Sequence, residues 1–348
     1  MGRWTVISAT DIVRAWGKIL KGEQPTLSIE ITRECPLKCP GCYAYDAAHL
    51  GGELTLRELN DSKGQSLVDG VLDVVDRLKP LQVSLVGGDP LVRYRELEIM
   101  IPQLLARGIH VRVVTSAFRA WKPEWSTLPC VDIVVSIDGL QPEHDLRRAP
   151  ATYDRILKNI AGQKITIHCT ITSQMMKRPG YLNEFLSFWT PRPEIKRVWL
   201  SLFTPQIGDK LAEILEPQER AQAIADMLEL RKRYPKLEMG EGLIRQFASP
   251  PKAPEECVFA RTTRTLSADL RTEVTPCQFG GHPDCSSCGC IASMGLAAVA
   301  AHKLGGIVPL GMIFKTSLKI GQIRRTVRAR SSNGEARVSQ VGELKVKQ

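Results

Sequence analysis

The sequence predicts an α/β fold: a partial (β/α)6 TIM-type barrel with a C-terminal Cys-rich extension. Two observations lead to this prediction. Short β-rich segments alternate with segments of helical spacing from residue 26 to residue 234, and the alternation stops near Met239, ahead of a group of cysteines. Strands that alternate with helices form parallel sheets with right-handed crossovers. Six such units in about 180 residues predict a barrel or partial barrel, with functional groups at the carboxyl ends of the strands.

The expected strands are short segments that are apolar throughout or alternate apolar and polar residues. The first alternates from Thr26 to Thr32 and leads directly into three cysteines. The second, Val83 to Val86, is short and wholly apolar apart from Ser84. The six expected strands span residues 26–32, 83–86, 109–114, 131–137, 164–171 and 198–203.

The expected helices repeat apolar residues at helical spacing and end at proline or glycine. Pro80 follows one of them, and Gly108 and Gly162 follow two others. Pro217 opens the longest, at a position where proline is preorganised for the first turn. The expected helices span residues 11–20, 66–79, 93–107, 152–161, 179–189 and 217–234.

Composition limits the classes of function. The chain has 348 residues, of which 43% are hydrophobic and 24% are charged, as in ordinary globular proteins. Its net charge is +10, but residues 315–348 alone contribute +7. This distribution argues against nucleic-acid binding by the whole surface and leaves open a tail that meets an anionic surface. We expect an N-terminal helix (1–25), the barrel core (26–238), the extension (239–314) and a basic, partly disordered tail (315–348).

Neither export nor a membrane span is expected. No secretory signal follows Met1, and the apolar stretch 291–314 is interrupted by His302 and Lys303. We therefore expect a cytoplasmic protein, in which grouped cysteines bind metal more often than they form disulfides. Stretch 291–314 and the basic tail leave two interpretations open: a helix packed on the barrel with a solvated tail, or peripheral contact with an anionic membrane.

The first cysteine group is Cys35, Cys39 and Cys42, spaced C-x3-C-x2-C on one loop after the first strand. Thiolates are ligands for zinc and for iron–sulfur clusters. Structural zinc usually takes paired ligands from two segments, whereas three closely spaced thiolates suit a cubane that keeps one iron open. An open iron can chelate the amino and carboxylate groups of methionine. A zinc or disulfide loop is the alternative.

This cysteine motif resembles that of the radical S-adenosylmethionine (SAM) superfamily, residue for residue at the three cysteines. Gly41 stands where the family usually has an aromatic residue, and the aromatic Tyr43 follows the third cysteine instead. In the family, the backbone at the position of Gly41 contacts the adenine of SAM. The resemblance therefore implies a 4Fe–4S cluster on the three cysteines, with SAM beside Gly41 and Tyr43.

Three further segments match the family in order. One runs from Gly87 to Pro90 after the second strand and resembles the GGEP motif that binds the SAM amino group. Another is a Thr-Ser pair at the end of the third strand, and the last is an SxDG strand end followed by His144 and Arg147. For these segments taken singly, a plain turn, loop polarity or a helix-capping pair is the alternative. The resemblance implies SAM contacts from Gly87, Gly88, Asp89, Pro90, Thr115, Ser116, Ser136 and Asp138.

The function that the resemblance implies is reductive cleavage of SAM. The reduced cluster passes an electron to the sulfonium, and the resulting 5′-deoxyadenosyl radical takes a hydrogen atom from a substrate. The protein supplies position and exclusion of water, while the cofactors supply the radical chemistry. An electron donor of the flavodoxin or ferredoxin type is the implied partner.

The second cysteine group resembles SPASM or twitch extensions, which hold auxiliary 4Fe–4S clusters. A short hairpin over residues 266–277 is expected to deliver its second cysteine. One cluster needs at most four thiolates, so we predict one auxiliary cluster with one spare cysteine, Cys288 or Cys290. A structural zinc site is the alternative, because C-x2-C is also zinc spacing. The remaining Cys130 and Cys169 are expected in the core. The group comprises Cys257, Cys277, Cys285, Cys288 and Cys290.

The substrate is not fixed by these motifs. Peptide-modifying relatives often carry a leader-peptide recognition domain before the cluster motif, and only 34 residues precede Cys35. We therefore expect a lipid, an isoprenoid or a small metabolite, with a ribosomal-peptide maturase as the alternative. A zinc-bearing nucleic-acid-binding protein is the alternative of another class. Because no aromatic residue follows Phe314 in the basic tail, base stacking has no platform there, and we expect no nucleic acid.

Overall fold

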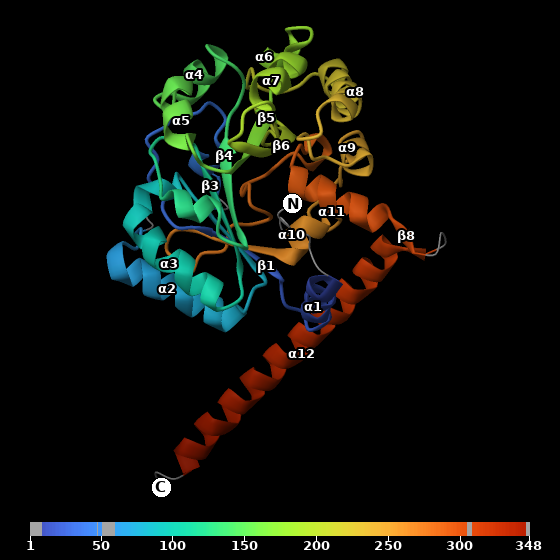
Figure 1. Cartoon of the computed structure of the whole chain (residues 1–348). Coiled ribbons are helices and arrows are strands. Elements are labelled where there is room, and N and C mark those ends of the chain that lie inside the picture. Colours follow the sequence, from blue (N-terminus) through green and yellow to red (C-terminus); the bar gives the residue numbers. More distant parts are fainter. Residues whose placement is uncertain (1–8, 47, 51–59, 305–307, 346–348) are drawn as a thin grey trace.

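The computed structural model describes residues 9–46, 48–50, 60–304 and 308–345. Its centre is a curved parallel sheet of seven strands in the order β6-β5-β4-β3-β2-β1-β7 (Figure 1). The expected (β/α)6 pattern is confirmed in its first six strands, because consecutive strands are neighbours throughout. The strands are β1 (Thr26–Glu30), β2 (Gln82–Val86), β3 (His110–Thr115), β4 (Val131–Ser136), β5 (Ile165–Ile171), β6 (Ile195–Leu202) and β7 (Thr263–Leu266), and a separate antiparallel pair is β8 (Lys303–Leu304) and β9 (Val308–Pro309).

The seventh strand was not expected. β7 pairs in parallel with β1, Thr26 opposite Thr263, so the extension contributes the edge strand next to the one that leads into the first cysteine group. The expected hairpin begins at its end, where Leu266 forms an antiparallel bridge with Glu273. Four residues are too few for the alternation to stand out in the sequence, and this strand depends on its pairing with β1.

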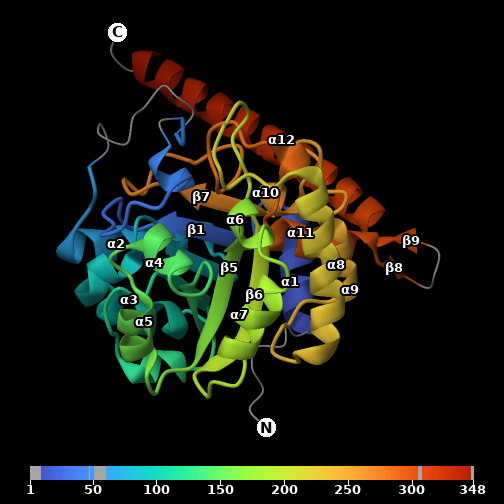
Figure 2. The same ribbon diagram turned by 90° about the horizontal axis from the view of Figure 1, so that it is seen from above.

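Helices cover the convex side of the sheet (Figure 2). They cover an apolar face, to which β2 contributes Val83 and Leu85 and β3 contributes Val111 and Val113, all buried. The opposite face carries polar side chains that pair across strands, such as His168 with Ser201. The helices are α1 (Ala9–Leu20), α2 (Gly64–Leu78), α3 (Tyr94–Ala106), α4 (Glu143–Arg148), α5 (Tyr153–Ile160), α6 (Ser173–Met176), α7 (Tyr181–Trp189), α8 (Pro217–Arg233), α9 (Glu241–Gln246), α10 (Val258–Thr262), α11 (Ile291–Ala301) and α12 (Leu310–Lys345).

The extension runs from β7 back to β6, the two edges of the open sheet. After α10 and the cysteine segment, the backbone of Gly289 accepts a hydrogen bond from Leu202 N at 3.0 Å, and Gly289 N donates to Thr204 Oγ1 at 2.8 Å. A side chain at residue 289 would overlap Leu202 O, so glycine is needed for this close approach. The second cysteine group is thereby attached at the carboxyl end of β6.

The apolar stretch 291–314 is divided between α11, the β8–β9 pair and the start of α12. Helix α12 packs along α1: the rings of Trp16 and Phe314 stack at 4.6 Å, and Trp16 Nε1 donates to Ser317 Oγ at 2.9 Å. It continues to Lys345, so the structure describes residues 315–345 as helical where a partly disordered tail was expected. In the described part of the chain, no helix is long and apolar enough to cross a membrane.

Candidate functional site

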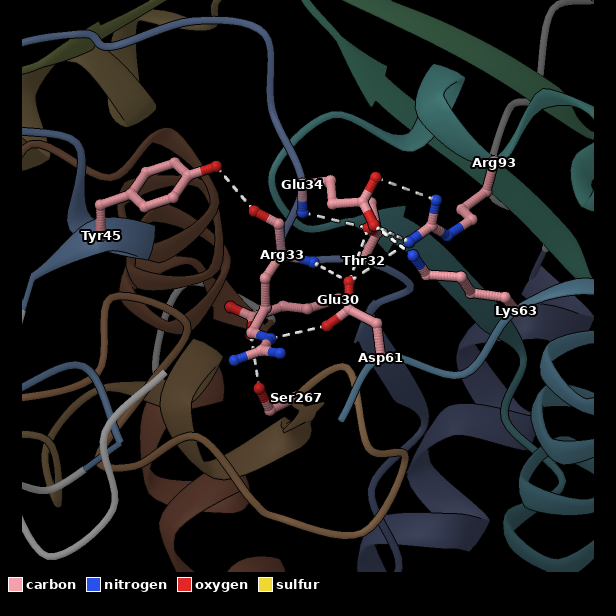
Figure 3. Close-up of polar contacts among 9 residues, drawn as sticks. All are labelled: Glu30, Thr32, Arg33, Glu34, Tyr45, Asp61, Lys63, Arg93 and Ser267. Carbon is pink, nitrogen blue, oxygen red and sulfur yellow. Dashed lines mark hydrogen bonds and ion pairs between the residues drawn. The ribbon is translucent and has the colours of Figure 1, made fainter. Parts of the chain in front are cut away.

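The first cysteine loop begins at a fixed point, the end of β1. Asp61 accepts hydrogen bonds from Thr32 Oγ1 (2.8 Å), Arg33 N (2.8 Å) and Arg33 Nε (2.6 Å), as Figure 3 shows. Arg93 donates to Glu34 Oε1 at 2.8 Å, and the charges of Arg93 and of Lys63 lower the pKa of Glu34 to about 2. This network of charged groups orders the backbone up to the residue before Cys35.

The segment from Gly87 to Asp89 lies directly on that backbone. Gly88 N donates to Thr32 O at 2.8 Å, and Asp89 N donates to Glu34 O at 2.9 Å. A Cβ at Gly88 would overlap Glu34 O, and one at Gly87, where φ is +131°, would overlap Thr32 O. The two glycines are therefore required for contact between this turn and the start of the cysteine loop. This contact fixes the position of the backbone immediately before Cys35.

Cys35, Cys39 and Cys42 are free, partly buried thiols on that loop. Burial raises the pKa of the Cys35 thiol to about 12, and burial also raises that of Cys42. A thiol binds a metal ion only as the thiolate, so we expect these buried cysteines to lose their protons when a metal ion binds. Leu37 N donates to Cys35 Sγ at 3.4 Å, which orients one of the three sulfur atoms.

Asp89 is the centre of a saturated cluster and not an exposed carboxylate. Its Oδ1 accepts from Thr115 Oγ1 (2.7 Å) and Leu91 N (3.0 Å), and its Oδ2 accepts from Ser116 Oγ (2.6 Å) and Ser116 N (2.8 Å). Only 1% of Asp89 is exposed. The structure thus brings together Asp89, Thr115 and Ser116, three of the expected SAM contacts, but the four donors fill the acceptor positions of the carboxylate.

Asp138 is likewise held within the protein. Its Oδ2 accepts from Arg148 Nε (2.8 Å) and Arg147 Nε (3.1 Å), and its Oδ1 accepts from Thr170 N (2.9 Å). Burial alone would raise the pKa of this carboxyl, but the charges of the two arginines outweigh it and hold the pKa well below 3.8. The carboxylate ties β4 to α4 and β5, and Ser136, which ends β4, is also buried.

His144 holds the backbone in place and makes no contact of its own with the cysteine loop. Its Nδ1 accepts from Asp138 N at 3.1 Å and its Nε2 lies 2.8 Å from Ala151 O, so the ring is the neutral tautomer with Nε2 protonated. Burial lowers its pKa to about 4. The ring therefore fixes the loop after β4 and has no nitrogen left for a ligand.

Gly41 and Tyr43 flank the third cysteine of the loop. Gly41 has φ +63°, and a Cβ there would lie 2.7 Å from the Phe203 ring. An aromatic residue at position 41 would require the Phe203 ring, just after β6, to move, and the left-handed backbone there favours glycine. Tyr43 points to the extension, with its ring edge-on to Phe279 at 5.1 Å.

The second cysteine group lines one cavity that is partly open to solvent. The cysteines come from the start of α10, from the loop after the hairpin and from the segment before α11. Arg220 of α8 supports this segment by donating to Ser287 O at 3.0 Å and to Cys288 O at 2.7 Å. The cysteines that line the cavity are Cys257, Cys277, Cys285, Cys288 and Cys290.

Comparisons with known proteins agree with this arrangement. A family model described as the radical SAM superfamily matches residues 29–181, which include the first cysteine loop and the turn that lies on it. The chain carries a radical SAM domain. A solved structure described as native anSMEcpe with bound AdoMet shares the fold, with a TM-score of 0.53 and 15% identity over 73% of this chain and 75% of that one. The zinc-bearing nucleic-acid-binding alternative is therefore dropped.

Two curated relatives extend the comparison. The chain is 24% identical over 272 residues to the PqqA peptide cyclase of Xanthomonas oryzae pv. oryzae, covering 73% of this chain and 68% of the cyclase. It is 29% identical over 157 residues to the mycofactocin maturase MftC of Mycobacterium tuberculosis, covering 41% of this chain and 37% of the maturase. The first of these alignments is longer than the radical SAM domain itself.

The donor sets fit iron–sulfur clusters. Radical SAM proteins use a 4Fe–4S cluster and SAM, and the three thiols on one loop of this domain are donors of the kind that such a cluster takes. The five thiols that line the second cavity exceed the four that one 4Fe–4S cluster takes.

Sequence reasoning missed several residues that shape the radical SAM domain. Asp61 lies shortly before α2, and nothing in its local sequence indicates that its carboxylate binds the start of the cysteine loop. Arg148 lies beside the HDxxR pattern, outside its defined positions, yet it makes the shorter bond to Asp138. Glu30 and His49 are buried partners at 2.6 Å. Glu30 falls on the polar face of β1, and this alternation was the one available signal.

Proposed function

We propose that this protein is a peptide-modifying radical SAM enzyme with one auxiliary 4Fe–4S cluster. The observation that carries the proposal is that both cysteine groups lie at the carboxyl ends of strands: one follows β1, and the other is attached to the end of β6 through Gly289 and reaches Tyr43 of the first loop through Phe279. The alignment with the PqqA peptide cyclase, a relative named for a peptide substrate, continues beyond the radical SAM domain. This supports a peptide over the lipid, isoprenoid or small metabolite first expected.

The residues divide the chemistry between two sites. Cys35, Cys39 and Cys42 hold the first cluster, where bound SAM would supply a 5′-deoxyadenosyl radical. The turn from Gly87 to Pro90 holds the cysteine loop in place. Asp89 orients the hydroxyl groups of Thr115 and Ser116 by accepting a hydrogen bond from each. We propose that SAM binds against these groups, with Gly41 and Tyr43 beside it and Ser136 and Asp138 supporting the next strand.

The auxiliary cluster occupies the cavity lined by five cysteines. Cys290 is buried and accepts a hydrogen bond from Gln278 Nε2 at 3.4 Å, and Cys257 lies 3.2 Å from Ser293 Oγ. Four of the five thiolates suffice, and Cys288 or Cys290 is the proposed spare. A group there would accept an electron from a substrate or brace the extension against β6.

Two partners complete the proposal. An electron donor of the flavodoxin or ferredoxin type reduces the first cluster. Peripheral contact with an anionic membrane is proposed through α12, which exposes Ile320 and Ile323 together with Lys315 and Lys319. A cytoplasmic protein with such a helix would bind the membrane reversibly.

The test of the enzyme class needs no substrate. Anaerobic, dithionite-reduced protein should cleave SAM to 5′-deoxyadenosine, and Cys35→Ala, Cys39→Ala or Cys42→Ala should each abolish it, because each thiolate holds one iron. Cys130→Ala, outside both groups, is the control and should retain cleavage. Formation of 5′-deoxyadenosine by any of the three loop variants would remove the first cluster from the proposal.

The test of the substrate class compares two fractions. Reduced protein and SAM are incubated with a peptide fraction and, separately, with a lipid extract from the same cells. Mass spectrometry follows the modification of either, and liquid chromatography follows 5′-deoxyadenosine. A peptide whose mass changes only with SAM and active protein supports the proposal. A modified lipid and unchanged peptides would refute it.

A further inference from the structure

A buried ionic contact lies between the two cysteine groups. His49, which follows the first cysteine loop, places Nε2 at 2.6 Å from Glu30 Oε1 on β1 and Nδ1 at 2.9 Å from Phe279 O in the extension. Ser267 Oγ donates to the second oxygen, Glu30 Oε2, at 3.0 Å, as Figure 3 shows. We refer to Glu30, His49, Ser267 and the Phe279 carbonyl as the joint.

The geometry fixes the charge of the joint. Both ring nitrogens of His49 face acceptors, so both carry a proton, and the ring is an imidazolium beside a carboxylate. The exposed fractions of His49 and Ser267 are 0%, and that of Glu30 is 3%. Burial favours the neutral ring, but the hydrogen bond and charge of Glu30 outweigh it and raise the pKa of His49 above 6.5. Both ions of the pair are therefore partnered and shielded from water.

The joint connects three segments that are far apart in the sequence. Glu30 ends the strand that leads to Cys35, His49 follows Cys42 by seven residues, and Phe279 follows Cys277 by two. The Phe279 ring lies edge-on to Tyr43, the neighbour of Cys42, and lines the cavity of the second cysteine group. A change in the joint thus reaches both groups through short stretches of backbone.

The approach of the extension to His49 is close. Gly280 has φ +63°, and a Cβ there would overlap His49 O, so the loop after Cys277 lies directly on the backbone of residue 49. Gly280 N also donates to Cys277 O at 2.9 Å, closing a turn around that cysteine. The loop that carries Cys277 is therefore fitted to His49 by backbone contact and by the bond to Phe279 O.

We propose that the Glu30–His49 pair is a positioning device that sets the Cys277 loop, and with it the auxiliary cluster, against the first cysteine loop. This inference rests on the proposed function, because it requires an auxiliary cluster in the cavity. Glu30 and His49 touch no reacting atom and act through Phe279 and Cys277. Their loss should alter the environment of the auxiliary cluster while the first cluster keeps its three ligands.

The test uses iron-loaded full-length protein with Glu30→Gln, His49→Gln and the double variant. Iron content is measured first, and reductive titration followed by electron paramagnetic resonance gives the midpoint potential of each cluster. Cys277→Ser identifies the auxiliary signal by its loss, and added SAM identifies the first cluster by its response. Asp132→Asn is the matched control, because Asp132 is a largely buried carboxylate paired with Arg197 near the start of β4, away from the joint.

The double variant separates position from charge. Because burial favours the neutral ring, Glu30→Gln also removes the proton that Glu30 holds on His49, and the net charge of the pair stays at zero. His49→Gln leaves the Glu30 carboxylate alone, and the double variant carries neither charge, so a purely electrostatic effect on the potential is confined to His49→Gln. We expect instead that the auxiliary signal shifts or becomes heterogeneous in all three, while the first cluster keeps its response to SAM and the control changes neither signal. If His49→Gln does not fold, Ser267→Ala, which removes one hydroxyl from the joint, serves in its place.

The outcomes are distinct. A shift of the potential confined to His49→Gln, or auxiliary signals like those of wild type in destabilised variants, would overturn the positioning role and leave the proposed function intact. Wild-type protein that holds about four irons per chain, and not about eight, would remove the auxiliary cluster and the inference together. Loss of the SAM response in the joint variants would show that Glu30 and His49 serve the first site instead.

Discussion

Asp89 offers a sharp test of the site because its carboxylate accepts four hydrogen bonds in a buried setting. Asp89→Asn keeps the shape but turns one oxygen into an NH2 donor. Either end of the amide then faces a hydroxyl, which can rotate to accept, and a backbone N–H, of Leu91 or Ser116, which cannot. The cost is one unsatisfied buried N–H, roughly 1–3 kcal/mol, plus the loss of charge from the remaining bonds. The smaller desolvation of a neutral group offsets part of this, so we expect a loss of about 3 kcal/mol in the free energy of unfolding.

The assay is anaerobic urea unfolding followed by circular dichroism, with stability taken from the linear dependence on denaturant. Thr115→Val, which removes one donor, should cost about 1 kcal/mol, and the double variant should cost less than the sum because both changes break the same bond. Burial raises the pKa of Asp89 against the effect of its donors. If the group were protonated, Asn would mimic it, so a variant within about 0.5 kcal/mol of wild type would refute the anionic cluster.

Three further predictions follow from single features of the structure. Folding lowers the pKa of Asp138, so its carboxylate stabilises the protein fully above pH 3.8, and this stabilisation is lost as the pH falls toward the pKa of the folded state. The difference in melting temperature between wild type and Asp138→Asn should therefore narrow below pH 4. A difference that does not change with pH would contradict this. Gly88→Ala forces a Cβ onto Glu34 O, which should cost roughly 1–3 kcal/mol and lower the iron content and SAM cleavage of the first site, whereas Gly17→Ala, in helix α1 with open space around its Cβ, should leave both intact. Full-length protein should co-sediment with anionic vesicles at low salt, and Lys315→Glu with Lys319→Glu should weaken this by roughly 1 kcal/mol per residue or more; wild-type protein that ignores the vesicles would refute membrane contact through α12.

The sequence determined the architecture of the barrel, because that architecture depends on local patterns. Six strands were recognisable from apolar runs such as Val83–Val86, since parallel strands buried under helices need continuous apolar residues on one face. The spacing of Cys35, Cys39 and Cys42 on one loop was likewise a local property, and by itself it indicated the chemistry of the first site. The grouping of five cysteines after residue 250 predicted a second site in the extension.

Only the tertiary structure decided how those groups are connected. The partners of Asp89 come from the end of β3, those of Asp138 come from α4 and β5, and no periodicity in a sequence encodes which buried carboxylate meets which donor. The pairing of β7 with β1 brings Ser267 to Glu30, and the attachment of Gly289 to β6 brings the second cysteine group to the barrel. A buried charge must find its counter-charge wherever the chain folds it. The contact of Glu30 with His49 and Phe279 is therefore a property of three-dimensional packing, and it is this packing that sets one cysteine group against the other.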